Sequence, residues 1–351
     1  NVMDKIIKED ALQIASSNYV DWRKLRGKTV LIAGANGYVP QFFVHGLLKR
    51  NEIRGDGIKV IALCRDRQKA EERFGAYFKR EDFQLLQQDV CAPIDINRKP
   101  DFIIHAASPA GIKVTMEHPE EVFRANVTGC ENLLKMAAEN GARLLYMSSV
   151  DVYGMLDEKR WISEEDIGTL NHVGLRSIYA ASKRAAETLC MCFEQKGADA
   201  VIVRPSQIMG PGIALHDERL HINMISQMMR GNQIVLKGDG TPRRSFIYIT
   251  DAITGMLAVL TRADKGAIYN ICTELGEATV RELAEKLAGL VKDRKIKIVY
   301  NMETRHSDPA VRQVVSTVCP SSQKLRGLGW ESKVTFTRSC QRMMQYYGLE
   351  V

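Results

Sequence analysis

The sequence predicts a doubly wound α/β fold, in which a parallel sheet carries helices on both faces. Two observations predict it: apolar runs of strand length recur along residues 29–205, and segments with helical periodicity separate them. These runs are apolar throughout, which is typical of parallel strands that are covered on both faces. Regular alternation of strands with helices indicates βαβ units, and such units build a parallel sheet.

The elements are expected in the following order. Residues 1–26 have the pattern of an amphipathic helical extension. A strand in KTVLIAG then leads into a glycine loop, and further strands are expected at 58–64, 83–90, 101–107, 142–149 and 198–205. Helical periodicity marks the intervening stretches 40–51, 120–140 and 177–196. After Pro205, glycine, proline and mixed charges indicate loops and short elements, until 247–260 returns to a strand followed by a helix.

Composition limits the possible classes of protein. The chain has 351 residues, a formal charge of +7, 45% hydrophobic and 26% charged residues, which is the balance of a soluble globular protein. No apolar run approaches the ~18 residues of a membrane-spanning helix, and no signal peptide is visible, so a cytoplasmic protein without membrane insertion is expected. The eight cysteines show no Cys-x-x-Cys pair, so we expect reduced thiols and no metal site.

The basic residues alternate with acidic ones, as in RDRQKAEERF, and do not form a basic stripe. This pattern favours a solvated surface, or an anionic small-molecule ligand, over a nucleic-acid partner.

The loop Gly34-Ala-Asn-Gly37-Tyr-Val-Pro40 follows a strand and opens a helix. Gly34 would allow a tight turn, and Gly37 would let the backbone approach a pyrophosphate at the helix N-terminus. We therefore predict a Rossmann-type dinucleotide site in which Asn36, Tyr38 and Val39 also contact the cofactor. Pro40 replaces the third glycine of the motif, and proline is tolerated in the first helical turn.

Two residues bear on the choice between NAD and NADP. Arg65, at the end of the second strand, could hold the 2′-phosphate of NADP, stack on the adenine, or be a surface residue. Asp89, at the end of the third strand, could meet the adenine or cap a turn. NAD is the expected cofactor, and NADP stays open.

Tyr179 and Lys183 stand four residues apart, on one helix face. A nearby ammonium, together with a positively charged nicotinamide, would move the phenol pKa from near 10 toward neutrality. Tyr179 is then a candidate base that takes a hydroxyl proton while hydride leaves the same carbon. Ser148-Ser149, at the end of the preceding strand, would supply a hydroxyl to the same site.

These motifs occur in one order with several others: DFIIHAASPA, RANVTGCENLL, MSSVDVYG, RPSQIMGPG, GDGTPRRSFIYITD, DPAVR and KLRGLGW. In this order, from about residue 28 to 347, the chain resembles the extended short-chain dehydrogenase/reductases that act as nucleotide-sugar epimerases, dehydratases and decarboxylases. The resemblance implies a nucleotide-diphosphate sugar as substrate and a homodimer formed through the helices that bear Asn126 and Tyr179.

The resemblance also implies residue roles. Ser149 would hydrogen-bond the reacting sugar oxygen, Lys183 would hold the nicotinamide ribose, and Asn126 would support the Lys183 site through water. The remaining implied contacts are to the cofactor from Val90, Ala106 and Ala107, and to the substrate from Ser108, Gln207, Arg219, Arg244 and Arg312. The implied division is an extension at 1–26, a dinucleotide domain at 27–205 rejoined by 246–273, and a smaller substrate domain at 206–245 and 274–351.

The motif after Ser149 separates the possible reactions. A 4,6-dehydratase of this family has Asp-Glu there, whereas this chain has Val150-Asp151, so dehydration is disfavoured. The chain resembles the uronate decarboxylases in three features: an acid before VYG, the HDER loop and the segment RSIYAASKRAAET. In those enzymes a longer Glu stands at the place of Asp151. Asp151 is accordingly either a catalytic acid or a structural cap.

We rank a 4-epimerase first, a UDP-glucuronate-type decarboxylase second and an NADP-dependent keto-sugar reductase third. A dinucleotide-sensing scaffold is the non-enzyme alternative, and such proteins tend to lose the tyrosine–lysine pair. Because Ser149, Tyr179 and Lys183 are all present, the sequence favours an enzyme.

Overall fold

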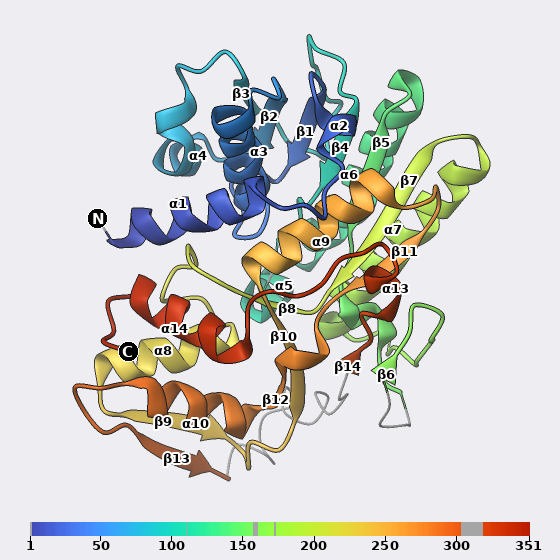
Figure 1. The fold of residues 1–351 in the computed structure, drawn as a ribbon. Helices are drawn as coiled ribbons and strands as arrows, with labels where there is room; N and C mark the ends of the chain where they lie inside the picture. The colour runs from blue at the N-terminus through green and yellow to red at the C-terminus, as the bar shows by residue number, and fades with distance from the viewer. Residues whose placement is uncertain (1, 110, 157–160, 172, 303–318) are drawn as a thin grey trace.

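The fold is described from a computed structural model, which covers residues 2–109, 111–156, 161–171, 173–302 and 319–351. Its main feature is a seven-stranded, wholly parallel sheet in the order β11-β7-β5-β4-β1-β2-β3 (Figure 1). The strands are β1 (Thr29–Ala33), β2 (Lys59–Cys64), β3 (Phe83–Gln87), β4 (Phe102–His105), β5 (Arg143–Met147), β7 (Asp199–Pro205) and β11 (Ile268–Ile271).

The described helices are α1 (Val2–Ala15), α2 (Trp22–Leu25), α3 (Gln41–Arg54), α4 (Arg67–Phe74), α5 (Ile112–Glu117), α6 (Pro119–Asn140), α7 (Ile178–Gln195), α8 (Leu220–Arg230), α9 (Ile249–Arg262), α10 (Val280–Leu290), α13 (Gln323–Arg326) and α14 (Phe336–Tyr346). Short 3₁₀ turns lie at Gly75–Tyr77, Val150–Tyr153, Leu175–Ser177 and Glu274–Gly276. Within the described ranges, no helix is both long and apolar enough to cross a membrane.

The absence of apolar–polar alternation in the strands has a direct structural cause. Along β1, Val30 and Ile32 enter one buried cluster with residues of α3 and α9. Leu31 and Ala33 enter a second cluster with residues of α6 and α7. Both faces of the strand are therefore buried in a hydrophobic core, which confirms the predicted doubly wound fold.

The strand order reverses next to β1, which pairs with β2 on one side and with β4 on the other. In open α/β sheets, the crevice at the carboxyl end of such a switch point is where ligands bind. The glycine loop follows β1, and Ala106-Ala107 follow β4, so both segments lie at this switch point.

A second group of elements gathers below the large sheet in the view of Figure 1. It comprises a three-stranded sheet of β8 (Gln207–Met209), β10 (Arg243–Tyr248) and β12 (Glu277–Thr279), and a parallel pair of β9 (Gln233–Lys237) and β13 (Lys297–Asn301). A further short pair joins β6 (Trp161–Ile162) to β14 (Cys319–Pro320). Residues of α8, α10 and α14 build a third core there, separate from the two that flank the large sheet.

Helix α1 links these groups of elements. A Cβ on Gly46 of α3 would lie 2.5 Å from the Ile14 side chain, so the missing side chain lets α1 pack closely on α3. On its other side, buried Asp10 forms an ion pair of 2.7 Å with Arg342 of α14 and accepts a hydrogen bond of 2.8 Å from Tyr248 at the end of β10. Arg342 also donates to the Tyr248 hydroxyl at 2.9 Å, which closes the network.

This buried network gives a stability prediction. Replacing Arg342 with Met should destabilise the chain by about 3–5 kcal/mol, because it leaves the Asp10 carboxylate buried without its cation. The double variant Asp10→Leu/Arg342→Met should recover most of the loss, because both charges are then gone. Urea unfolding of the wild type and of these two variants gives the comparison. Equal destabilisation by the single Arg342 change and the double change would contradict the assignment.

Candidate active site

The glycine loop is held against the end of β4. Gly34 has φ of +78°, and a Cβ there would lie 2.6 Å from the Ala107 Cα. Only glycine satisfies both the positive φ and this close approach. The Gly37 amide donates to the Gly34 carbonyl at 2.8 Å, and Pro40 stands just before the first residue of α3. The predicted loop residues Gly34, Gly37, Ala106 and Ala107 are thus brought together at the switch point.

The predicted adenosine-side residues also converge. Asn36 donates to the Asp66 carbonyl at 3.0 Å, which ties the glycine loop to the end of β2. Arg65 is exposed and lies 3.8 Å from the Asp89 carboxylate and 3.6 Å from that of Glu121. Two carboxylates beside Arg65 make this corner less favourable for an added 2′-phosphate, which agrees with NAD better than with NADP. Val90 is buried beside α6, where a Cβ on Gly129 would meet its side chain at 2.8 Å.

Lys183 is the most constrained side chain of the site. It is 1% exposed, and its ammonium donates to the Met147 carbonyl at 2.7 Å, which fixes α7 to the end of β5. The same nitrogen lies 5.0 Å from the centre of the Tyr146 ring and 5.6 Å from that of Tyr179. Burial lowers the pKa of Lys183 to about 7, because the ammonium loses its contact with water.

Ser149, Asp151 and Tyr179 surround one point just beyond β5. The Ser149 hydroxyl donates to the Asp151 carboxylate at 3.0 Å and accepts from the Asp151 amide at 3.1 Å. Solvent reaches Asp151, yet protein surrounds it on most sides, and this environment raises the pKa of the carboxyl while Ser149, Arg244 and Lys183 act in the opposite direction. Ser149 is the cap residue of the turn Val150–Tyr153, and the Asp151 carboxylate accepts a hydrogen bond from its hydroxyl while staying open to solvent.

We expected Lys183 and a positively charged nicotinamide to lower the pKa of the Tyr179 phenol, but the protein's own groups raise it. Burial raises the pKa of the phenol well above its usual value, and the negative charge of Asp151 raises it further, while a hydrogen bond with Ser149 and the charge of Arg219 lower it. Lys183 does not offset this, because its own charge is disfavoured by burial and its ammonium is directed to Met147. The protein's own groups therefore hold Tyr179 as a neutral phenol.

Asn126 of α6 is fully buried, and its side-chain amide donates to the Ser182 hydroxyl at 2.9 Å. Ser182 directly precedes Lys183 in the sequence. Its Oδ1 is buried and has no protein partner among the described residues. Ser182 in turn donates to the Tyr179 carbonyl at 2.9 Å. Asn126 is therefore linked through the Ser182 hydroxyl to the turn of α7 that bears Tyr179 and Lys183.

The structure places the predicted substrate residues at different points. Arg244 on β10 is half-buried, and its charge lowers the pKa of Asp151, so it belongs to the same site. The guanidinium of Arg219 pairs with Asp217 and lies over the Tyr38 ring at 5.4 Å, which joins the HDER loop to the glycine loop. Ser108 and Gln207 are half-buried, after β4 and at the start of β8, and Arg312 lies outside the described residues.

Sequence reasoning missed the support beneath α7. Glu187 and Arg204 of β7 form a buried two-point ion pair, with distances of 2.9 and 2.7 Å. Arg204 also lies over the ring of Tyr153, whose hydroxyl donates to Asn270 of β11 at 2.6 Å. The available signal was the position of Glu187, four residues after Lys183 and therefore on the same helix face.

The chain belongs to the NAD dependent epimerase/dehydratase family, whose pattern matches residues 30–272. It is 30% identical over 330 residues to UDP-glucuronic acid decarboxylase 3 of Arabidopsis thaliana, covering 92% of this chain and 90% of that one. These findings confirm the resemblance, the enzyme class and NAD as the cofactor of the family.

Solved structures confirm the fold. Epimerase Mth375 of Methanothermobacter thermautotrophicus superposes with a TM-score of 0.78 at 23% identity, covering 93% of this chain and 94% of that one. MoeE5, solved in complex with UDP-glucuronic acid and NAD, has a TM-score of 0.72 at 22% identity, covering 91% and 98%. The similarity to a decarboxylase supports our second-ranked reaction better than the 4-epimerase that we ranked first.

Gly34→Ala should disrupt the glycine loop, because a methyl group there meets the Ala107 backbone in addition to straining a positive φ. The matched control is Gly57→Ala, since Gly57 has φ of +66° and open space around it. The control should lose about 1–2 kcal/mol of stability from the left-handed backbone alone. Gly34→Ala should lose more and should fail to bind NAD in a calorimetric titration. Equal losses for the two variants, with NAD binding retained, would rule out the close approach.

Lys183 should titrate near neutral pH. In protein labelled with ¹³C at lysine Cε, we expect one resonance to shift with a midpoint near pH 7, whereas ordinary lysines titrate at about 10.4. Because the unfolded chain keeps this proton to higher pH, the wild type should gain stability relative to Lys183→Met as pH rises from 7 toward 10. The signal should vanish in Lys183→Arg. A spectrum in which every lysine titrates near 10 would contradict the assignment.

Proposed function

We propose that the chain is a decarboxylase of UDP-uronic acids, with UDP-glucuronic acid as the expected substrate and NAD as the cofactor. The observation that carries the proposal is the placement of Asp151. Its carboxyl bonds to Ser149, lies within the electrostatic influence of Tyr179, Lys183 and Arg244, and remains open to solvent. An accessible acid at this point is what decarboxylation needs in addition to the groups that an epimerase uses.

The reaction begins with loss of hydrogen at sugar C4. Tyr179 and Ser149 hold the C4 oxygen, and its proton passes to Tyr179 when the phenolate is available. A bound nicotinamide supplies the hydride acceptor at the start and the hydride donor at the end. The site around Lys183 and Tyr179 is buried, so little water screens charges there. A positive charge added near Tyr179 would therefore lower the phenol pKa strongly.

The C4 ketone makes the C5 carboxylate a β-keto acid. When the C5–C6 bond breaks, CO2 leaves and the electron pair moves through C5 to the C4 oxygen as an enolate. Ser149 and protonated Tyr179 donate hydrogen bonds to that oxygen. Asp151 then gives a proton to C5, and its raised pKa favours the protonated form that this step requires. The ketone that results is reduced at C4, which gives a UDP-pentose.

Two features favour this reaction over 4-epimerisation. An epimerase must turn the keto sugar within the site but needs no acid at C5, so it would leave Asp151 without a chemical role. The chain is also similar along 92% of its length to a protein named a UDP-glucuronic acid decarboxylase. The complex of MoeE5 with UDP-glucuronic acid and NAD adds that a uronic acid nucleotide fits this fold.

The same proposal includes the architecture that we expect around the site. The dinucleotide domain at 27–205 and 246–273 would hold NAD, and the segments 206–245 and 274–351 would close over the nucleotide sugar. Arg219, Arg244 and Arg312 would meet the diphosphate, for which guanidinium groups are suited. Two chains would associate through α6 and α7, in the cytoplasm.

The reaction is tested by incubating the protein and NAD with UDP-glucuronic acid and weighing the sugar nucleotide by mass spectrometry. We expect a product lighter by one CO2. Asp151→Asn should slow its formation by about 10²-fold or more, because the proton donor is lost. Asp151→Glu, which restores the longer acid of the decarboxylases, should keep activity. An isomer of unchanged mass that separates from UDP-glucuronic acid by chromatography would establish the epimerase instead.

Tyr179→Phe separates the enzyme from a dinucleotide-sensing scaffold. If Tyr179 carries the C4 proton, the variant should lose turnover while its affinity for NAD stays within a few fold of wild type. NAD binding by the wild type without turnover of any UDP-uronic acid or UDP-hexose would favour the sensor. Undiminished turnover in Tyr179→Phe would remove the proposed base.

A further inference from the structure

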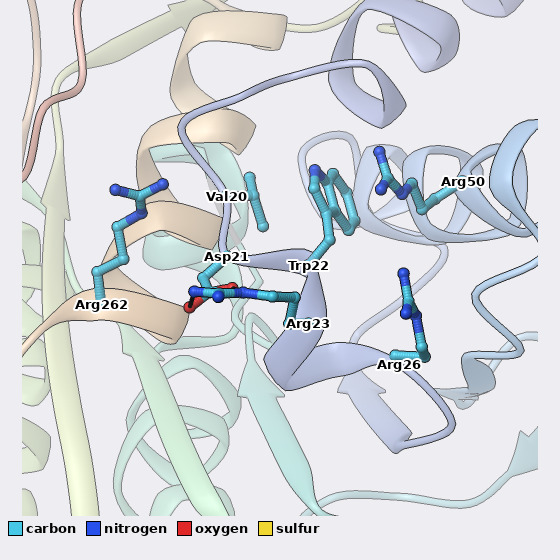
Figure 2. Close-up of a pocket in the computed structure, with 7 residues that line it drawn as sticks. All are labelled: Val20, Asp21, Trp22, Arg23, Arg26, Arg50 and Arg262. Carbon is cyan, nitrogen blue, oxygen red and sulfur yellow. Dashed lines mark hydrogen bonds and ion pairs between the residues drawn. The ribbon is translucent and has the colours of Figure 1, made fainter.

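A cavity of about 380 Å³ lies beside α2, and Figure 2 shows the residues that line it. Three segments meet there: the turn that leads into α2, the last part of α3 and the end of α9. Its lining consists of Val20, Asp21, Trp22, Arg23, Arg26, Arg50 and Arg262. Four of these seven residues are arginines, although the chain's basic residues are otherwise interspersed with acids.

The cavity is separated from the glycine loop by the length of β1. Arg26 precedes Thr29, the first residue of the strand, whereas Gly34 follows Ala33, the last one. A five-residue strand spans roughly 17 Å. The cavity therefore opens at the amino ends of the strands, opposite the edge at which NAD and the sugar nucleotide would bind.

The cavity carries an excess of positive charge. Arg23 makes a two-point ion pair with Asp21, at 3.0 and 3.1 Å. Arg26 and Arg50 share one carboxylate, that of buried Asp56, at 3.1 and 2.6 Å. Arg262 donates to the Asn18 carbonyl at 3.1 Å and forms no ion pair with a described residue. Four cations thus face two anions.

The four arginines differ in how firmly they are held. Arg50 donates to Asp56 and to the Ala15 carbonyl, and its guanidinium lies 4.6 Å from the Trp22 ring centre, so it forms a rigid floor. The side chains of Arg23 and Arg26 are 85% and 64% exposed. These two, with exposed Arg262, can turn toward a ligand that enters the cavity. Figure 2 shows Arg23 and Arg262 on one side of Trp22, with Arg26 and Arg50 on the other.

The negative end of α9 does not cancel this charge. A helix C-terminus presents carbonyl groups that would repel an anion. Here Arg143, from β5, donates to the Leu260 carbonyl at 3.3 Å and to the Ala263 carbonyl at 2.8 Å. These terminal carbonyls are therefore already paired with a cation.

We propose that this cavity binds a small anion with two or three phosphate groups, at a site distinct from the active site. Guanidinium groups form paired hydrogen bonds with phosphate oxygens, and several of them around one cavity suit an anion of several charges. The volume is within the range of small-molecule sites, which begins at about 300 Å³. Val20 and Trp22 are 4% and 6% exposed, so the cavity offers little apolar surface and the phosphates must provide the affinity.

The proposal is tested with inorganic diphosphate as the probe, by isothermal titration of the full chain in low salt. The test variant is Arg23→Gln/Arg26→Gln/Arg262→Gln, which leaves Arg50 and its contacts with Asp56 intact. The matched control is Arg230→Gln/Arg338→Gln, two exposed arginines on α8 and α14. We expect the triple variant to bind about tenfold more weakly or worse, since three of the four guanidinium groups that face the cavity are removed. The control should bind as the wild type does.

A second variant tests the direction of the effect. Asp21→Asn removes the carboxylate that competes for Arg23, so it should bind diphosphate several-fold more tightly than wild type. Because diphosphate could also enter the active site, the wild-type cavity and the triple variant are also compared in an Arg219→Gln/Arg244→Gln background, and the binding that depends on Arg23, Arg26 and Arg262 should persist there. Equal affinity of the wild type and the triple variant, or no binding by the wild type at millimolar diphosphate, would overturn the proposal. Neither result depends on whether the chain decarboxylates UDP-glucuronic acid.

Discussion

The hydrogen bond from the Lys183 ammonium to the Met147 carbonyl is the contact on which the site depends. It joins the helix that bears Tyr179 to the strand that leads to Ser149, and so sets the distance between the two hydroxyl groups. A cation buried this deeply is costly unless it has a fixed partner. The protein offsets part of that cost with one carbonyl, two aromatic rings and the field of Glu187, whose own charge is held by Arg204, and burial still lowers the pKa of Lys183 to about 7. The geometry of the reacting groups is therefore a result of how this single charge is accommodated.

Contacts between loops explain why the candidate active site lies at the reversal of strand order. The close approach of Gly34 to Ala107 brings the ends of β1 and β4 together at the reversal of strand order, and Asn36 extends the loop to the end of β2. Arg219 then bridges from the HDER loop to Tyr38 of the glycine loop. The glycine loop and the HDER loop thus share a contact, so that each supports the shape of the other.

Local patterns in the sequence predicted much of this arrangement. Gly34, Gly37, Ser149 and the Tyr179–Lys183 pair could be found because their spacing follows directly from a strand end, a turn or one helix face. The fold class followed from strands that are apolar on both faces. Partners distant in sequence could not be found in this way: the Met147 carbonyl, Arg204 beneath α7, and Asp56 between Arg26 and Arg50. The raised pKa of Tyr179 also depends on burial and on Asp151, which the spacing of motifs does not reveal. The choice between epimerase and decarboxylase rested on one substituted position, Val150, and on the length of Asp151, and similarity to a decarboxylase altered our ranking.

The network of Asp10, Tyr248 and Arg342 also has a consequence for how the chain folds. Asp10 and Arg342 are separated by 332 positions, so this contact closes a very long loop. Loop closure costs more entropy as the loop lengthens, and a ribosome delivers Arg342 long after Asp10. During translation, Asp10 of α1 therefore has no Arg342 to pair with until α14 has been synthesised. The nascent protein can complete the large sheet before α14 has been synthesised, but it can join its two groups of elements through Asp10 and Arg342 only after α14 has left the ribosome.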